Sequence, residues 1–198
     1  TAAFYKNETS VGEAIREHGI ARKELFVTTK LWTDAMGFDE ALKAYDESLE
    51  RLGMDYVDLY LIHWPVTGKF KEAWKALEKI YKEGRVKAIG ISNFLPYHLE
   101  QLLPEVEIMP TVNQMEFHPY LIQQELLDLC AANNIIYQAW GPIMKGRVFE
   151  IPLFKQIGRK YRKNQAQVVL RWDLQRGVST IPKSVNQARV EANADIFD

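Results

Sequence analysis

Two hydrophobic patterns alternate along the chain. Short runs rich in β-branched and aromatic residues are apolar almost throughout, which is typical of strands buried on both faces of a parallel sheet. Longer segments between them repeat apolar residues at i, i+3, i+4 and i+7, the spacing of a helix with one buried face. The predicted strands are 25–31, 56–62, 86–91, 109–114, 135–139 and 178–182. The predicted helices are 9–18, 38–52, 70–83, 96–103, 122–132, 151–162 and 165–175.

Local signals indicate where some of these helices begin and end. Gly53 follows the periodic segment 38–52, and Gly84 follows 70–83, the place where glycine commonly terminates a helix. Residues 10–13 (Ser-Val-Gly-Glu) have the spacing of a capping box, so we expect the first helix to start there.

Strand–helix units recur roughly every 25–30 residues, which predicts parallel strands joined by helical crossovers. Either an open doubly wound sheet or a closed barrel would fit. The barrel is favoured because no Gly-rich phosphate fingerprint follows any strand and because polar residues follow many strands. We therefore predict one α/β domain over residues 1–198, a (β/α)8 TIM-type barrel. Since fewer than eight strands are visible, we expect the first strand, the first helix and most of the second strand to be absent.

Composition and charge exclude several classes of function. The net charge is −1 without a basic stripe, so we expect no nucleic-acid partner. No apolar run reaches the length of a membrane helix, and no secretory leader is visible. The single cysteine, Cys130, lies on the apolar face of a predicted helix and fits the reducing cytoplasm. The histidines lack metal-ligand spacing; we expect His18 at a helix end, His98 at the surface and His118 in a structural role.

Three polar residues stand next to hydrophobic runs: Tyr5, Lys30 and His63. Because the carboxyl ends of parallel strands meet at one rim, we expect these side chains to gather there. A nearby ammonium lowers the pKa of a phenol, so Lys30 is predicted to lower that of Tyr5. Tyr5 could then act as a general acid toward a carbonyl oxygen, while a neutral His63 orients that oxygen.

Six motifs occur in one order along the chain: TAAFYKNE, TTKLW, LIHWP, GISNF, VNQMEFHP and IPKS followed by an arginine. With these motifs the chain resembles an aldo-keto reductase from Thr1 to Asp198. The resemblance implies reduction of small aldehydes or ketones with NADPH as the cofactor, and it assigns catalysis to Tyr5, Lys30 and His63. It implies cofactor contacts by Ser92, Asn93, Gln114, Trp140, Gly141, Ile143, Lys183, Ser184, Arg189 and Asn193, and substrate-pocket walls from Trp32 and Trp64.

Within this resemblance, Ser92, Asn93 and Gln114 would hold the nicotinamide carboxamide and Trp140 would stack under the ring. Lys183, Ser184 and Arg189 would grip the adenosine 2′-phosphate, because a planar guanidinium and an ammonium suit a dianion.

The chain departs from the family pattern at several positions. Gly141 replaces the usual serine, and Ala192 replaces a glutamate that contacts the adenine, unless Glu191 substitutes for it. The aspartate that pairs with the family's lysine would precede Thr1 and is missing.

Short loops resemble those of bacterial members that reduce keto-sugars and dicarbonyls such as 2,5-diketogluconate or methylglyoxal. Two other interpretations stay open, a nicotinamide-binding regulatory subunit and an inactive fragment. The expected partner is a small carbonyl compound. We expect a complete form to be a monomer, and unpaired sheet edges predict that this chain self-associates.

Overall fold

The structure is a computed structural model that describes residues 1–198. The chain forms two compact units, Thr1–Asn113 and Gln114–Asp198. The first unit contains η1 (Ala3–Tyr5), α1 (Glu8–Glu17), η2 (Arg22–Glu24), β1 (Thr28–Leu31), α2 (Phe38–Leu52), β2 (Val57–Ile62), α3 (Phe70–Lys82), β3 (Val86–Ser92), α4 (Pro96–Leu102) and η3 (Leu103–Glu105). The second contains α5 (Gln124–Ala132), β5 (Ile136–Trp140), η4 (Met144–Glu150), α6 (Pro152–Tyr161), α7 (Gln165–Gln175), β6 (Ser179–Thr180) and α8 (Gln187–Ala194). Strand β4 (Val112–Glu116) includes the boundary.

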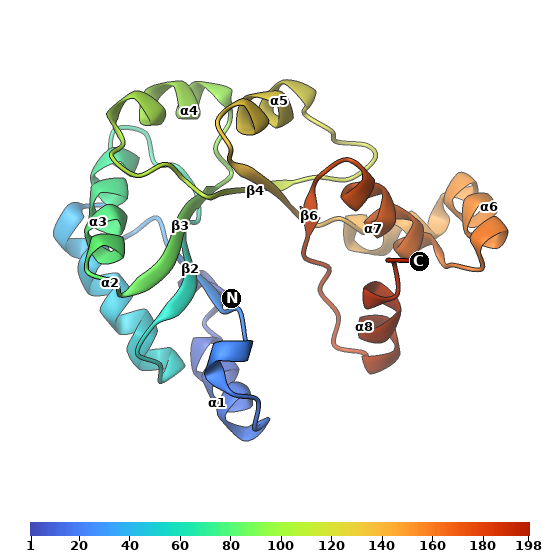
Figure 1. The fold of residues 1–198 in the computed structure, drawn as a ribbon, viewed down its shortest axis with the longest axis horizontal. Helices are drawn as coiled ribbons and strands as arrows, with labels where there is room; N and C mark the ends of the chain where they lie inside the picture. Colours follow the sequence, from blue (N-terminus) through green and yellow to red (C-terminus); the bar gives the residue numbers. More distant parts are fainter. The chain divides into compact units, whose positions relative to one another are not determined.

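Parallel strands form the centre of the first unit. Strands β1, β2 and β3 lie side by side in that order, with Lys30 opposite Leu61 and Ile62 opposite Ile91. Every residue of β2 is buried, Asp58 included, as its mostly apolar run predicts. Helices α2 and α3 pack on each other, and α3 also contacts β2 and β3 (Figure 1).

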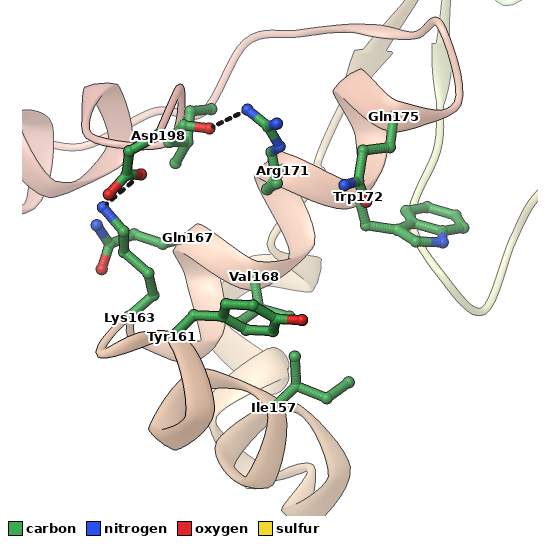
Figure 2. Close-up of a pocket in the computed structure, with 10 residues that line it drawn as sticks. Ile157, Tyr161, Lys163, Gln167, Val168, Arg171, Trp172, Gln175 and Asp198 are labelled. Atoms are coloured by element: carbon green, nitrogen blue, oxygen red, sulfur yellow. Dashed lines mark hydrogen bonds and ion pairs between the residues drawn. The ribbon is translucent and has the colours of Figure 1, made fainter.

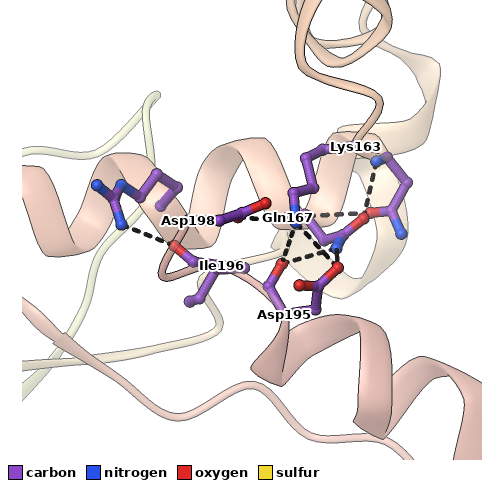
Figure 3. A network of polar contacts seen from close by, with 7 residues as sticks. Lys163, Gln167, Asp195, Ile196 and Asp198 are labelled. Carbon is purple, nitrogen blue, oxygen red and sulfur yellow. Dashed lines mark hydrogen bonds and ion pairs between the residues drawn. The ribbon is translucent and has the colours of Figure 1, made fainter.

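Parallel strands β5 and β6 belong to the second unit, with Gln138 opposite Ser179. Val148, Phe154 and Val169 form an apolar cluster between η4, α6 and α7. The C-terminal segment lies against α7 (Figure 3). The Lys163 ammonium pairs with the carboxylates of Asp195 and Asp198 at 2.9 and 2.8 Å.

The helix predicted over 38–52 is confirmed as α2, and Gly53 ends it with a left-handed φ of 62°. Helix α7 has the predicted bounds 165–175, and Cys130 is buried in α5.

Two local predictions are wrong. The helix predicted over 9–18 is present as α1 (Glu8–Glu17), but Ser10 lies exposed inside it and does not cap it. The predicted capping box does not form: Asn7 is the N-cap residue and makes no side-chain cap hydrogen bond, while the Glu8 carboxylate accepts from Thr29 and Arg51. His98 is 7% exposed, not on the surface, since its Nδ1 accepts a hydrogen bond from the Leu95 N–H at the start of α4. No helix is both long and apolar enough to cross a membrane.

Candidate active site

The first unit brings Tyr5, Lys30 and His63 together. Tyr5 ends η1, Lys30 lies in β1, and His63 directly follows β2. The His63 N–H donates to the Leu31 carbonyl at 3.1 Å, which holds His63 beside the end of β1. The Tyr5 hydroxyl lies 3.5 Å from His63 Nε2, and Lys30 Nζ lies 5.1 Å from the centroid of the Tyr5 ring. A phenol, an imidazole and an ammonium thus share one small region at the carboxyl ends of β1 and β2.

Burial sets the charge state of the imidazole. His63 is 6% exposed, and burial, with a further contribution from the Lys30 charge, lowers its pKa to about 4. The ring is therefore neutral at physiological pH. His63 Nδ1 is buried without a hydrogen-bond partner, so we infer the tautomer that carries its proton on Nε2. This tautomer can donate a hydrogen bond toward Tyr5 or toward a carbonyl oxygen beside it.

Burial also shifts the pKa values of Lys30 and Tyr5, and so sets which of them holds a proton at neutral pH. Burial lowers the pKa of Lys30 to about 8, so most Lys30 side chains still carry the charged ammonium at pH 7. Burial raises the pKa of Tyr5, whereas we had expected Lys30 to lower it. The reason is geometric, because the ammonium lies near the ring and donates to the Thr1 carbonyl at 3.1 Å. Tyr5 thus keeps its proton at neutral pH, the form in which a phenol can act as an acid.

Aromatic side chains form a wall beside the three polar groups. Phe4 stacks on Trp32 with ring centroids 3.9 Å apart, and the Trp32 ring meets His63 edge-on at 5.1 Å. Trp64, the other predicted wall, is 43% exposed. We did not predict Phe4; its place next to Tyr5 in TAAFYKNE was the available signal. The wall presents apolar surface next to the three polar groups.

The predicted carboxamide-binding residues are buried but divided between the two units. In the first unit, Ser92 ends β3 and Asn93 follows it with a left-handed φ of 63°. Asn93 Nδ2 donates to the His63 carbonyl at 2.9 Å and to Ser92 Oγ at 3.1 Å. In the second unit, Gln114 Nε2 donates to Gln138 Oε1 at 2.7 Å. Asn93 therefore ties the loop after β3 to the backbone of His63.

Three further predicted residues follow one another in the second unit. Trp140 ends β5 and is partly exposed. Gly141 has a φ of 65°, a backbone conformation that a serine would adopt with strain. Ile143 packs against the cluster around Val148. The glycine that departs from the family pattern thus stands at a position whose backbone favours glycine.

The predicted phosphate-binding residues surround the start of α8. Lys183 and Arg189 are exposed, and neither side chain forms an ion pair. Ser184 Oγ accepts from the Asn186 N–H at 3.1 Å, and Asn186 Oδ1 in turn accepts from the Arg189 N–H at 3.1 Å. Two unpaired cations and a hydroxyl at a helix start are a donor set that fits a phosphate dianion. Asn193 and Glu191 lie farther along α8, where Glu191 accepts from Gln187 Nε2 at 2.9 Å.

A separate groove of about 540 Å³ occurs in the second unit (Figure 2). Its lining comes from α6, α7 and the C-terminal segment, and includes Tyr161, Arg171 and Trp172. None of the predicted catalytic or cofactor residues lines it.

Known proteins resemble this chain along its whole length. The family model described as "Aldo/keto reductase family" matches residues 1–198. The "Glyoxal reductase" of Bacillus subtilis (strain 168) is 54% identical over 198 residues, covering all of this chain and 72% of the relative. The "9,11-endoperoxide prostaglandin H2 reductase" of Trypanosoma cruzi (strain CL Brener) is 46% identical over 201 residues, covering 100% of this chain and 71% of the relative.

Solved structures agree. An aldo/keto reductase from Brucella melitensis has a TM-score of 0.95 at 47% identity and covers 100% of this chain and 77% of its own. A Bombyx mori aldo-keto reductase solved in complex with NADP has a TM-score of 0.93 at 36% identity, covering 100% of this chain and 72% of its own. These matches confirm the predicted α/β class and its (β/α)8 barrel type, of which the chain represents part. The chain belongs to the aldo/keto reductase family of oxidoreductases.

Proposed function

We propose that the protein reduces small aldehydes and ketones, keto-sugars and dicarbonyls among them, to alcohols with NADPH, and that Tyr5 is the general acid. The observation that carries this proposal is the group of Tyr5, Lys30 and His63 beside the aromatic wall of Phe4 and Trp32. The glyoxal reductase that is 54% identical to this chain over 198 residues supports a dicarbonyl substrate.

The three polar side chains divide the proton chemistry. A neutral His63, with its proton on Nε2, donates a hydrogen bond to the substrate carbonyl oxygen and orients it. Tyr5 then transfers its phenolic proton to that oxygen as negative charge develops there. The Lys30 ammonium stabilises the phenolate that Tyr5 becomes, at a distance of 5.1 Å between Nζ and the ring centroid. Bound NADPH supplies the hydride that reduces the carbonyl carbon.

Side chains of suitable chemistry are available for the cofactor in each unit. Lys183, Ser184 and Arg189 would hold the 2′-phosphate, since two unpaired cations and a hydroxyl match a dianion. Ser92 and Asn93 in the first unit provide a hydroxyl and an amide, which suit a carboxamide because it needs both a donor and an acceptor. Gln114 in the second unit carries an amide of the same chemistry. Trp140 would stack on the nicotinamide ring. Gly141, Ile143 and Asn193 would complete the contacts along the dinucleotide.

Replacing Tyr5 by Phe tests the role of the general acid. NADPH oxidation would be followed with glyoxal, methylglyoxal and a panel of aldehydes, and NADPH binding would be measured separately by fluorescence. We expect Tyr5→Phe to lower kcat by about 10²–10⁴-fold with little change in NADPH affinity. Tyr97→Phe is the matched control, because Tyr97 is 52% exposed and Tyr5 50%.

Two outcomes would count against the proposal. Equal turnover by Tyr5→Phe and the unchanged chain would exclude Tyr5 as the proton donor. NADPH binding without oxidation by any carbonyl compound would favour the nicotinamide-binding regulatory protein instead.

A further inference from the structure

A buried carboxylate follows the predicted catalytic tyrosine closely in sequence. Glu8 is the first residue of α1, three positions after Tyr5, and is 1% exposed. One of its oxygens accepts a hydrogen bond from the Thr29 hydroxyl, in the residue before Lys30. The other pairs with Arg51 Nε of α2 at 2.7 Å. Glu8 thus joins the segment that carries Tyr5 to the strand that carries Lys30.

One face of helix α1 packs closely against α2. Gly12, one turn after Glu8, leaves no room for a side chain, because an added Cβ would stand 2.0 Å from the Leu52 carbonyl oxygen. One turn later, Arg16 Nη1 donates to the same oxygen at 3.1 Å. Since residues at i, i+4 and i+8 share one helix face, Glu8 is the first member of a continuous contact stripe.

The surroundings of Glu8 make its partners hard to replace. Tyr60, opposite Thr29 in the sheet, is fully buried, and its hydroxyl has no hydrogen-bond partner. Water does not reach the carboxylate, so its charge depends on Arg51 and Thr29 for compensation. Breaking one of these contacts leaves an uncompensated buried charge and favours release of the start of α1.

We propose that Glu8 is a positioning residue, which fixes the segment carrying Tyr5 against β1 and so holds the phenol in its half-buried place beside Lys30 and His63. This inference rests on the proposed function for the role of Tyr5 in catalysis. The geometric part of it, that Glu8 places the Tyr5 side chain, can be tested without turnover.

The test follows the Tyr5 phenol directly. In protein labelled with ¹³C-tyrosine, the Tyr5 signal is the one that Tyr5→Phe removes, and its titration reports its pKa. Burial raises the pKa of Tyr5 in the native chain, so a released segment should let Tyr5 titrate near the ordinary value. We expect this return in Glu8→Ala, and in Glu8→Gln if the alanine variant does not fold.

Charge effects are separated from positioning by Arg51→Met. Loss of a positive charge would by itself raise the pKa of a phenol, whereas release of the segment lowers it. We therefore expect Arg51→Met to lower the pKa of Tyr5 as the Glu8 variants do.

Glu78 provides the matched control for loss of a buried acid in the same unit. It is 5% exposed and accepts hydrogen bonds from Trp74 Nε1 and from the N–H groups of Glu107 and Ile108. Glu78→Ala or Glu78→Gln should lower the melting temperature as the Glu8 variants do, but leave the titration of Tyr5 unchanged. An unshifted Tyr5 in the Glu8 variants, or an equal shift in the Glu78 variants, would overturn the proposal.

Kinetics supply the second readout, taken well below the melting temperature of each variant. We expect the Glu8 variants to lose about 10-fold or more in kcat with a smaller change in KM, because misplacing a reacting group costs rate. Wild-type kcat in the Glu8 variants, when Tyr5→Phe has lost activity, would overturn the inference. If Tyr5→Phe keeps full activity while the Glu8 variants shift the titration, the proposed function fails and the positioning of Tyr5 stands.

Discussion

A buried aspartate in α7, Asp173, should lower the free energy of unfolding at neutral pH. Asp173 is fully buried, and burial raises its pKa from 3.8 to about 7, against a hydrogen bond from Thr180 that lowers it. One carboxyl oxygen accepts from Thr180 Oγ1 at 2.9 Å, and the other has no partner. Replacing Asp173 by Asn removes the ionisation while keeping an acceptor for Thr180. We therefore expect Asp173→Asn to stabilise the protein at pH 7.5.

The size of the effect follows from the pKa shift. A shift of about three units corresponds to about 4 kcal/mol at roughly 1.36 kcal/mol per unit, which sets the ceiling. The new amide N–H would lack a hydrogen-bond partner, which costs about 1–2 kcal/mol of stability. The net stabilisation expected of Asp173→Asn at pH 7.5 is therefore about 2–3 kcal/mol.

The sign depends on pH in a defined way. Because the folded-state pKa is raised, the folded and unfolded states both hold the proton below about pH 4, and ionisation then contributes nothing to stability. Stability falls as pH rises from about 4 to 7, where only the unfolded state ionises, and stays low above that range. The advantage of Asp173→Asn should therefore shrink to near zero at pH 5.

Urea unfolding at pH 5 and pH 7.5 measures both quantities. Asp128→Asn is the control, because Asp128 is an exposed aspartate on α5 and its replacement should change stability by less than about 0.5 kcal/mol. The reasoning is refuted if Asp173→Asn is less stable at pH 7.5, or if its difference from the unchanged chain is the same at both pH values.

Three other changes should have measurable effects. Gly12→Ala should lower the free energy of unfolding by about 2 kcal/mol or more in urea, because the new Cβ would meet the Leu52 carbonyl oxygen at 2.0 Å. Changing Lys183 and Arg189 together to Ala should lower the affinity for NADPH by about 10–100-fold in a fluorescence titration and leave the affinity for NADH nearly unchanged. Turnover should stay constant from pH 5.5 to 7 and fall above about 8, as Lys30 loses its proton.

Each of these three predictions has a control variant or an outcome that would contradict it. Glu13→Ala, on the exposed side of α1, should leave stability nearly unchanged, and equal losses at both positions would count against the close contact of α1 with α2. Lys160→Ala, an exposed lysine of α6, should bind both nucleotides normally. An equal loss of NADPH and NADH affinity in the double variant would contradict a 2′-phosphate site. A decline in turnover centred near pH 6.5 would point to a histidine in place of Lys30.

Periodicity predicted the helices best where an amphipathic pattern and an end signal agreed. Helix α2 carries both, and its bounds match the prediction. Strands were displaced by one to three residues, since an apolar run does not say where pairing begins. The predicted strand 178–182 contains only the two-residue β6: the Ile181 N–H still donates to the Ala139 carbonyl, but Pro182 has no N–H to continue the ladder. Local composition thus indicates the kind of element, while pairing decides its length.

The grouping of Tyr5, Lys30 and His63 could be predicted because parallel strands bring their carboxyl ends to one rim. Sequence alone places Lys30 and His63 after neighbouring strands, and the register of β1 against β2 brings them together. The direction of the pKa shift of Tyr5 could not be predicted in this way. It depends on how deeply the phenol is buried and on the Lys30 ammonium lying over the ring, and neither is written in residue spacing.

The same limit applies to Glu8 and Asp173, which sequence patterns present as ordinary helix acids. An acid at the first position of a helix normally suggests a favourable interaction with the helix dipole at an exposed site. Glu8 instead lies buried against Arg51 and Thr29, whereas Asp173 is buried with one oxygen unpaired. Their consequences should therefore be opposite. Removing the charge of Glu8 releases Arg51 and the Tyr5 segment, while removing that of Asp173 relieves a desolvated group, so one replacement should destabilise the fold and the other should stabilise it.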